Sequence, residues 1–143
     1  MNFALDYAAR TIEDKDVWIY VLDDDNVLSN NFKNIIYDLD CTCPINVFNI
    51  KMKMISNGFD GTIQAPLTYG HALFHIDSAN FIVQRKVFDQ IGHVNEVESK
   101  WHDGIFIEKS LKLQIPFHYI NKVYGFHNGF NMVEEIEKNL KKS

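Results

Sequence analysis

The order of apolar and polar residues predicts strands and helices that alternate along the chain. Residues 17–22 are β-branched, aromatic or aliphatic, which is typical of a buried strand. Residues 45–52 alternate with a period of two, so we expect a second strand whose Asn and Lys side chains face away from the core. Residues 117–126 are expected to form a late strand.

Apolar residues three and four positions apart predict helices between these strands. The first is short and amphipathic, and lies before residue 13. The second has Phe32, Ile35, Ile36 and Leu39 on its apolar face, with Ser29 or Asn30 as its cap. Further helices are expected at about 85–91, about 104–113 and 132–142.

Length and composition predict one domain over residues 1–143, and the alternation of strands and helices predicts an α/β fold. The chain has 46% hydrophobic and 13% aromatic residues, enough for a sizeable core. No apolar run approaches the roughly 20 residues of a membrane span, and the start lacks the layout of a secretory signal, so we expect a cytoplasmic protein without a transmembrane segment. The net charge of −5 argues against general nucleic-acid binding.

The two cysteines, Cys41 and Cys43, stand one residue apart and are followed by Pro44. This spacing is too close for an unstrained disulfide, and two thiols are too few for a zinc site. We therefore expect reduced structural thiols.

The strand expected at residues 17–22 leads directly into Asp23, Asp24, Asp25 and Asn26. Three adjacent carboxylates repel one another, and a divalent cation would relieve that repulsion. Mg²⁺ and Mn²⁺ bind through carboxylates together with substrate phosphates. The alternative is a solvated turn, since Asp and Asn are common turn residues. Because ligands of open α/β sheets bind beyond the carboxyl ends of strands, we favour a metal-assisted phosphate or diphosphate site.

Four segments in this order resemble the nucleotide-sugar glycosyltransferases of the GT-A fold, particularly the family-2-like group. They are WIYVLDDDN at 18–26, DSANFIVQR at 77–85, WHDGIFIE at 101–108 and YGFHN at 124–128. The resemblance covers about residues 5–128. It implies a GT-A-like, Rossmann-like mixed sheet flanked by helices, and transfer of a sugar from a nucleotide-diphosphate donor to a glycan, lipid or protein acceptor, with inversion.

The resemblance also implies roles for individual residues. Asp23 and Asp25 match the DxD motif, in which the first Asp contacts the donor's ribose and the last coordinates Mn²⁺ or Mg²⁺; Asp24 is the variable middle residue beside the donor. His127 matches the histidine that joins the metal or the diphosphate, although a loop histidine is also common at a polar surface. Asp103 matches the general base, but here His102 precedes it where the family usually has Glu, and Asp103 also suits a helix N-cap.

The second motif implies a small-residue loop beneath the donor sugar, formed by Ser78 and Ala79. Arg85 can reach a phosphate as a fixed-charge fork, or lie at the surface as the first residue of a helix. Trp101 suits either a sugar-stacking role or the core.

The front of the chain departs from the family. Members of the family normally carry further βα units before the DxD strand, whereas this chain has twenty-two residues before Asp23. The resemblance therefore implies that most of the nucleoside pocket is absent: the chain is N-terminally truncated, one half of a split enzyme, or a reduced form. Unpaired strand edges then favour a homo-oligomer or a partner subunit.

Alternatives to the transferase are a non-catalytic module of the same fold and a metal-dependent phosphatase or nuclease.

Overall fold

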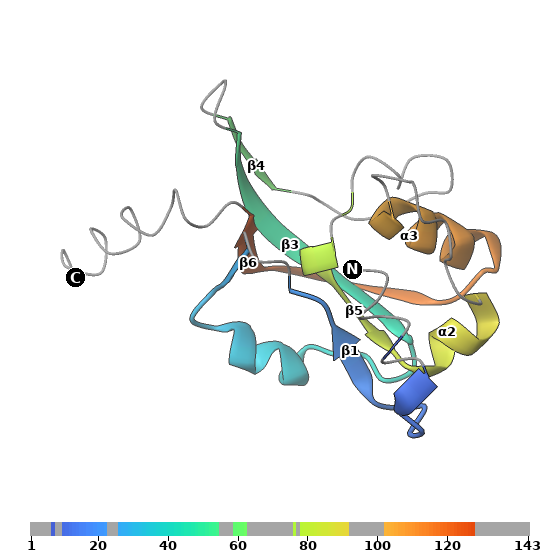
Figure 1. The fold of residues 1–143 in the computed structure, drawn as a ribbon. Coiled ribbons are helices and arrows are strands. Elements are labelled where there is room, and N and C mark those ends of the chain that lie inside the picture. The colour runs from blue at the N-terminus through green and yellow to red at the C-terminus, as the bar shows by residue number, and fades with distance from the viewer. Residues whose placement is uncertain are drawn as a thin grey trace.

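The computed structural model describes residues 7, 10–22, 26–54, 59–62, 76, 78–91 and 102–127. Within these residues six strands form one mixed sheet (Figure 1). The strands are β1 (Trp18–Tyr20), β2 (Val27–Leu28), β3 (Ile45–Met54), β4 (Phe59–Thr62), β5 (Phe81–Gln84) and β6 (Phe117–His127). The helices are the 3₁₀ turns η1 (Phe32–Tyr37) and η3 (Ser78–Asn80), and the α-helices α2 (Lys86–Ile91) and α3 (His102–Lys112).

Strand β3 is the centre of the sheet. The strand order is β1-β5-β3-β6-β2, and β4 pairs with the far end of β3. β3 is parallel to β6 and antiparallel to β5 and β4, while β1 is antiparallel to β5 and β2 is antiparallel to β6. Consequently β1, β3 and β6 run in the same direction, and their carboxyl ends point to the same end of the sheet.

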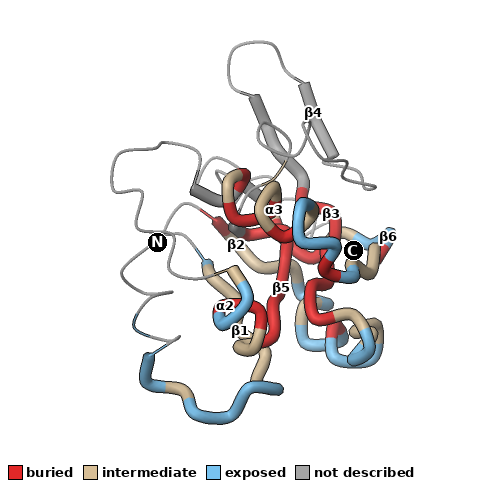
Figure 2. The backbone as a smooth tube through the Cα atoms, turned by 90° about the vertical axis from the view of Figure 1, so that its right-hand side faces the viewer, coloured by how far each residue is buried: buried red, intermediate tan, exposed pale blue. Residues whose placement is uncertain are grey.

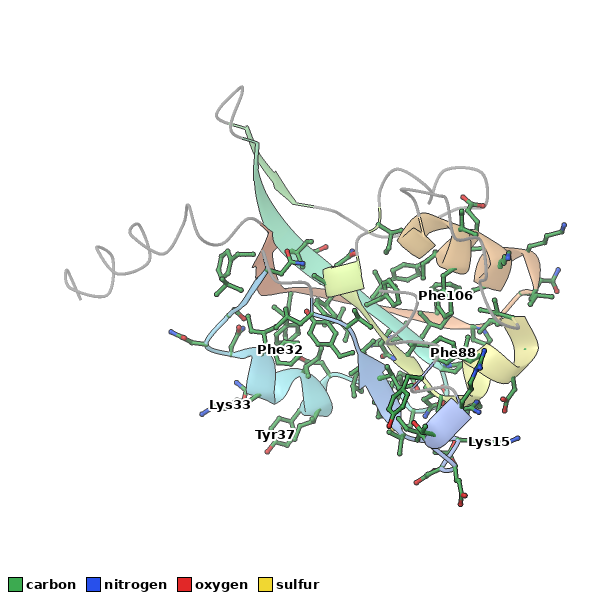
Figure 3. The ribbon with its side chains drawn as sticks, viewed as in Figure 1. Lys15, Phe32, Lys33, Tyr37, Phe88 and Phe106 are labelled. Atoms are coloured by element: carbon green, nitrogen blue, oxygen red, sulfur yellow. The ribbon has the colours of Figure 1, made fainter. Side chains whose placement is uncertain are left out.

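Helices cover both faces of the sheet. On one face, α2 and α3 pack on the apolar side chains of β3 and β5, and the Phe106 ring stacks on Phe81 with centroids 5.8 Å apart (Figure 3). On the other face, η1 places Phe32 against Tyr20 of β1 at 5.0 Å. All four residues of β5 are buried, and Figure 2 shows that burial concentrates along this strand and its neighbours.

The mixed α/β class expected from the sequence is confirmed. β1 lies within the expected strand at 17–22, β3 and β6 begin at the expected residues, and α2 and α3 fall at the expected helices. Tyr7, Arg10 and Thr11 are helical, in agreement with the expected first helix. The helix expected at 132–142 lies outside the described residues. No helix among the described residues has the length and apolarity needed to cross a bilayer.

Two expectations were wrong. The second helix is a single 3₁₀ segment that ends before Leu39. Its flanking residue Asn31 makes no capping bond through its side chain, which instead accepts a hydrogen bond from the Ser29 hydroxyl. The asparagines of β3 do not face water: Asn46 is 0% exposed and Asn49 is 7% exposed. The reason is that β3 is central and covered on both faces, so both sets of its alternating residues are buried.

Candidate functional site at the carboxyl end of the sheet

The end of β1 lies beside the turn η3. Register pairs Trp18 with Gln84 and Tyr20 with Ile82, so β1 runs toward the start of β5. The Tyr20 hydroxyl donates a 2.8 Å hydrogen bond to the carbonyl oxygen of Ala79. The last described residues of this segment are therefore positioned next to η3. Asp23, Asp24 and Asp25, which follow them, lie outside the described residues.

The chain on the other side of the aspartates is positioned by β6. Val27 pairs with Phe126 and Leu28 with Gly125 in antiparallel register. Asn26 and His127 are the residues directly next to the Val27–Phe126 pair. Asn26 is 7% exposed, so this part of the chain is packed against the protein. The sheet thus brings the residue that follows Asp25 next to His127, whose side chain lies outside the described part.

The turn η3 is built into the sheet through a buried asparagine. Asn80 is 0% exposed and its Nδ2 donates to the carbonyl oxygen of Phe48, at 3.3 Å. Ala79 is 2% exposed and packs in the cluster on the η1 face. The backbone of Ser78 begins the turn. The sequence predicted small residues here but missed Tyr20 and Asn80, which fix the turn. The available signal was an amide directly before three apolar residues, Phe81–Val83.

Asp103 is the second residue of α3, so it lies in the first helical turn. Gly104 is buried, and Phe106 stacks on Phe81, the residue that directly follows η3. The first turn of α3 therefore reaches the same end of the sheet as η3. A carboxylate at such a position also interacts favourably with the helix dipole. Trp101 lies outside the described residues.

The pairing of β6 with β3 is irregular before β6 reaches this end of the sheet. Phe48 pairs with Ile120, Asn49 with Val123 and Ile50 with Gly125, so β6 has three extra residues, Asn121, Lys122 and Tyr124. The Asn49 Nδ2 donates to the Asn121 Oδ1 at 3.0 Å, which holds the irregularity against β3. Such bulges bend a strand and redirect the residues beyond it. Here they set the direction of the segment that ends at His127.

Lys122 and Tyr124 also attach β6 to the end of η1. The Lys122 Nζ donates to both carboxylate oxygens of Asp38, at 2.6 and 2.9 Å, and the Tyr124 hydroxyl donates to the same carboxylate. The bond from Lys122, followed by that from Tyr124, holds the pKa of Asp38 below its ordinary value. Burial, together with the bond to Asp38, raises the pKa of Tyr124 to about 12. These contacts fix η1 across β6.

Arg85 is not brought to this end of the sheet. Its backbone N–H donates to the carbonyl oxygen of Val17, at the start of β1, at 2.9 Å. Its guanidinium pairs with Asp89 at 2.7 Å, and its side chain is 13% exposed. Arg85 directly precedes α2, close to the helix start that the alternative expects, but its side chain is largely buried rather than at the surface. The length of β5 separates Arg85 from η3.

Among the described residues, no three His, Cys, Asp or Glu side chains lie together in a way that could hold a metal ion. The predicted ligands Asp23 and Asp25 fall outside this part of the chain, as does the side chain of His127. The metal site therefore stays a prediction.

No protein-family model matches this chain, and no curated protein matches it. The resemblance to GT-A glycosyltransferases therefore rests on the order and spacing of the four sequence motifs and stays a prediction.

Proposed function

We propose that this protein is a metal-dependent glycosyltransferase of the GT-A type, which moves a sugar from a nucleotide-diphosphate donor to an acceptor hydroxyl. The observation that carries the proposal is the convergence of three motifs that are far apart in the sequence. The chain around the aspartates, the turn η3 and the first turn of α3 meet at one end of the sheet. In open α/β sheets this is the end at which ligands bind.

The donor and its metal are assigned to the aspartate segment and the end of β6. The carboxylates of Asp23 and Asp25 are hard oxygen ligands that suit Mn²⁺ or Mg²⁺, and a contribution from the His127 imidazole would favour Mn²⁺. The pairing of Val27 with Phe126 supports this combination, because Asn26 and His127 are the next residues along the chain. When bound, the ion acts as a Lewis acid that stabilises the charge on the departing nucleoside diphosphate.

The acceptor side is assigned to Asp103. Its carboxylate would take the proton from the acceptor hydroxyl while that oxygen forms a bond to the anomeric carbon of the sugar. The bond from the anomeric carbon to the diphosphate breaks at the same time, on the opposite face, so the configuration inverts. The small-residue turn beginning at Ser78 would lie beneath the sugar.

The first experiment is calorimetric titration with a panel of nucleotide sugars and free nucleotides, in Mn²⁺ and then in chelator. We expect one donor to bind only with metal, and Asp25→Asn to abolish that binding. Glu13→Gln is the matched control. Glu13 is exposed and precedes β1, so this substitution removes the same charge at the opposite end of the strand. Failure of every donor to bind to the folded protein would refute the proposal and favour the non-catalytic module.

A second variant separates binding from chemistry. Asp103→Asn keeps the size of the side chain but removes the base, so we expect donor binding to persist while sugar transfer is lost. Hydrolysis of the nucleotide sugar and transfer to a mixture of glycan, lipid and protein acceptors would be followed by release of the nucleoside diphosphate. Unchanged transfer by Asp103→Asn would show that Asp103 is not the base.

A further inference from the structure

We propose that the turn at residues 40–43 binds a monovalent copper ion through the sulfur atoms of Cys41 and Cys43. This turn directly precedes β3 and lies at the amino end of that strand, because Pro44 accepts a 2.8 Å hydrogen bond from Gln84 at the far end of β5. The proposed copper site is therefore distinct from the aspartate segment and does not depend on the glycosyltransferase proposal.

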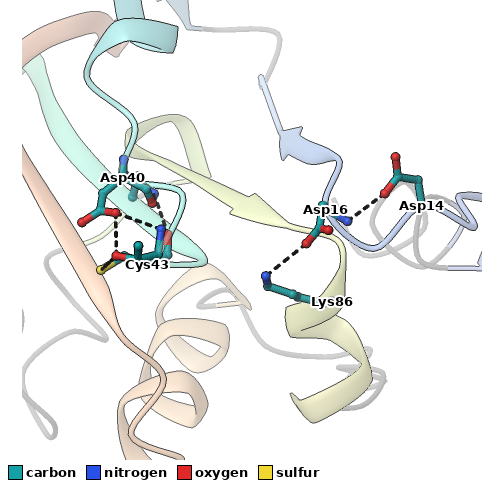
Figure 4. Close-up of polar contacts among 7 residues, drawn as sticks. Asp14, Asp16, Asp40, Cys43 and Lys86 are labelled. Atoms are coloured by element: carbon teal, nitrogen blue, oxygen red, sulfur yellow. Dashed lines mark hydrogen bonds and ion pairs between the residues drawn. The ribbon is translucent and has the colours of Figure 1, made fainter.

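The backbone on both sides of the two thiols is fixed by hydrogen bonds. The Cys43 N–H donates to the Asp40 carbonyl oxygen at 3.1 Å, which closes a four-residue turn with Cys41 inside it. The Thr42 N–H and hydroxyl both donate to the Asp40 Oδ1, at 2.8 and 2.6 Å (Figure 4). The first and last Cα atoms of such a turn lie within about 7 Å, so both cysteines belong to one small closed unit.

The buried side chain of Asn46 in β3 holds the turn through hydrogen bonds. Asn46 is 0% exposed. Its Oδ1 accepts from the Asp40 N–H at 2.9 Å, and its Nδ2 donates to the carbonyl oxygens of Cys43 at 2.8 Å and of Asp40 at 3.3 Å. The backbone conformation of the turn is thus set before any ion arrives, which lowers the entropy lost on binding.

The thiols themselves are available. Both cysteines are free; Cys41 is exposed and Cys43 is half-buried. The Cys43 Sγ lies 3.9 Å from the Thr42 hydroxyl oxygen, a weak contact that an ion would replace at little cost. A disulfide between Cys41 and Cys43 would close a ring that contains a single intervening residue. Such a small ring conflicts with the preferred disulfide geometry. The dithiol form is therefore favoured over the oxidised form.

The number and type of ligands select the ion. Two thiolates form a soft donor set, and soft donors favour Cu(I) and Zn²⁺ among biological metals. Structural zinc requires four ligands, and the described residues hold no group of three His, Cys, Asp or Glu side chains that could bind a metal. Cu(I) is satisfied by two sulfur ligands. Binding converts each S–H to a thiolate and releases its proton to solvent, so affinity falls as pH is lowered.

The test is an anaerobic titration of the reduced full-length chain with Cu(I) held by a chromophoric chelator. We expect the protein to withdraw one Cu(I) per chain, with a sulfur-to-copper charge-transfer band in the ultraviolet. The chain has two cysteines, so Cys41→Ser and Cys43→Ser remove the candidate ligands one at a time. Each variant should lose the one-to-one complex, whereas Zn²⁺ should not bind detectably in the matching competition with a zinc indicator.

Three results would overturn the proposal. Copper retained by both serine variants would assign the binding to side chains other than the two cysteines. Retention by one serine variant alone would show that a single thiol suffices, and one ion per two chains would show a bridge between copies. Circular dichroism of each variant checks the fold, and Cys41→Ser is the safer variant because Cys41 is exposed. X-ray absorption at the copper edge should report two sulfur neighbours in the native chain.

Discussion

Replacing Asn46 with alanine removes the side chain that attaches the 40–43 turn to β3. Three hydrogen bonds are lost, at 2.8, 2.9 and 3.3 Å, from a residue that is 0% exposed. At a net contribution of about 0.5–1.5 kcal/mol for each bond, the free energy of unfolding should fall by about 1.5–4.5 kcal/mol. This loss is a large fraction of the roughly 5–15 kcal/mol that stabilises a typical domain.

Urea unfolding followed by circular dichroism measures this loss. With m-values of about 1–3 kcal/mol per M for small proteins, the midpoint should fall by about 0.5 M or more. Asn34→Ala is the matched control, because Asn34 is exposed on η1, and substitutions at such positions usually change stability by less than about 0.5 kcal/mol. Equal midpoints for the two variants would refute the structural role of Asn46 and support the water-facing position that strand alternation predicts.

Two other contacts give predictions for stability. Burial and the bond to Asp38 raise the pKa of Tyr124 to about 12, above the unfolded value of about 10. The stability linked to this phenol is therefore present below pH 10 and is lost as pH rises through 12. Urea unfolding of Tyr124→Phe should therefore lose less stability over that range than the native chain; parallel curves would contradict this. Phe106→Ala removes the ring stacked on Phe81 and should cost about 3–5 kcal/mol, whereas Phe106→Leu should cost less; equal thermal midpoints for the two variants would argue against the stacked packing.

The apolar pattern was sufficient to locate most elements. β1, β3, β6, α2 and α3 all form where hydrophobic periodicity and the Gly and Pro positions predict them. These elements bury their apolar residues against the sheet, so local pattern and final packing agree. The pattern was least informative for η1. Its apolar residues have helical spacing, but Ile36 and Tyr37 are 64% and 82% exposed, and the segment forms only a 3₁₀ turn.

The positions of buried polar residues could not be derived from local pattern. Alternation assigns each residue of a strand to one of two faces, but it does not say that both faces of β3 are covered. Asn46 is buried because the turn before β3 folds back over it and uses its amide, and Asn49 is buried because the extra residues of β6 provide a partner. The partner of Asn49 depends on the pairing of β3 with β6, and the partner of Asn46 depends on the conformation of the turn before β3; strand alternation determines neither.

Strand order also determines which motif residues lie near one another. Ser78, Ala79 and Arg85 belong to one continuous motif, but residues 81–84 between them form β5. A strand rises about 3.3 Å per residue, so the turn η3 and Arg85 are separated by roughly 13 Å. η3 lies at the end of β1 that leads to the aspartates, while Arg85 lies at its start, bonded to Val17. Arg85 therefore pairs with Asp89 at the far end of β5. In the proposed transferase, the phosphate contacts near η3 come from other residues.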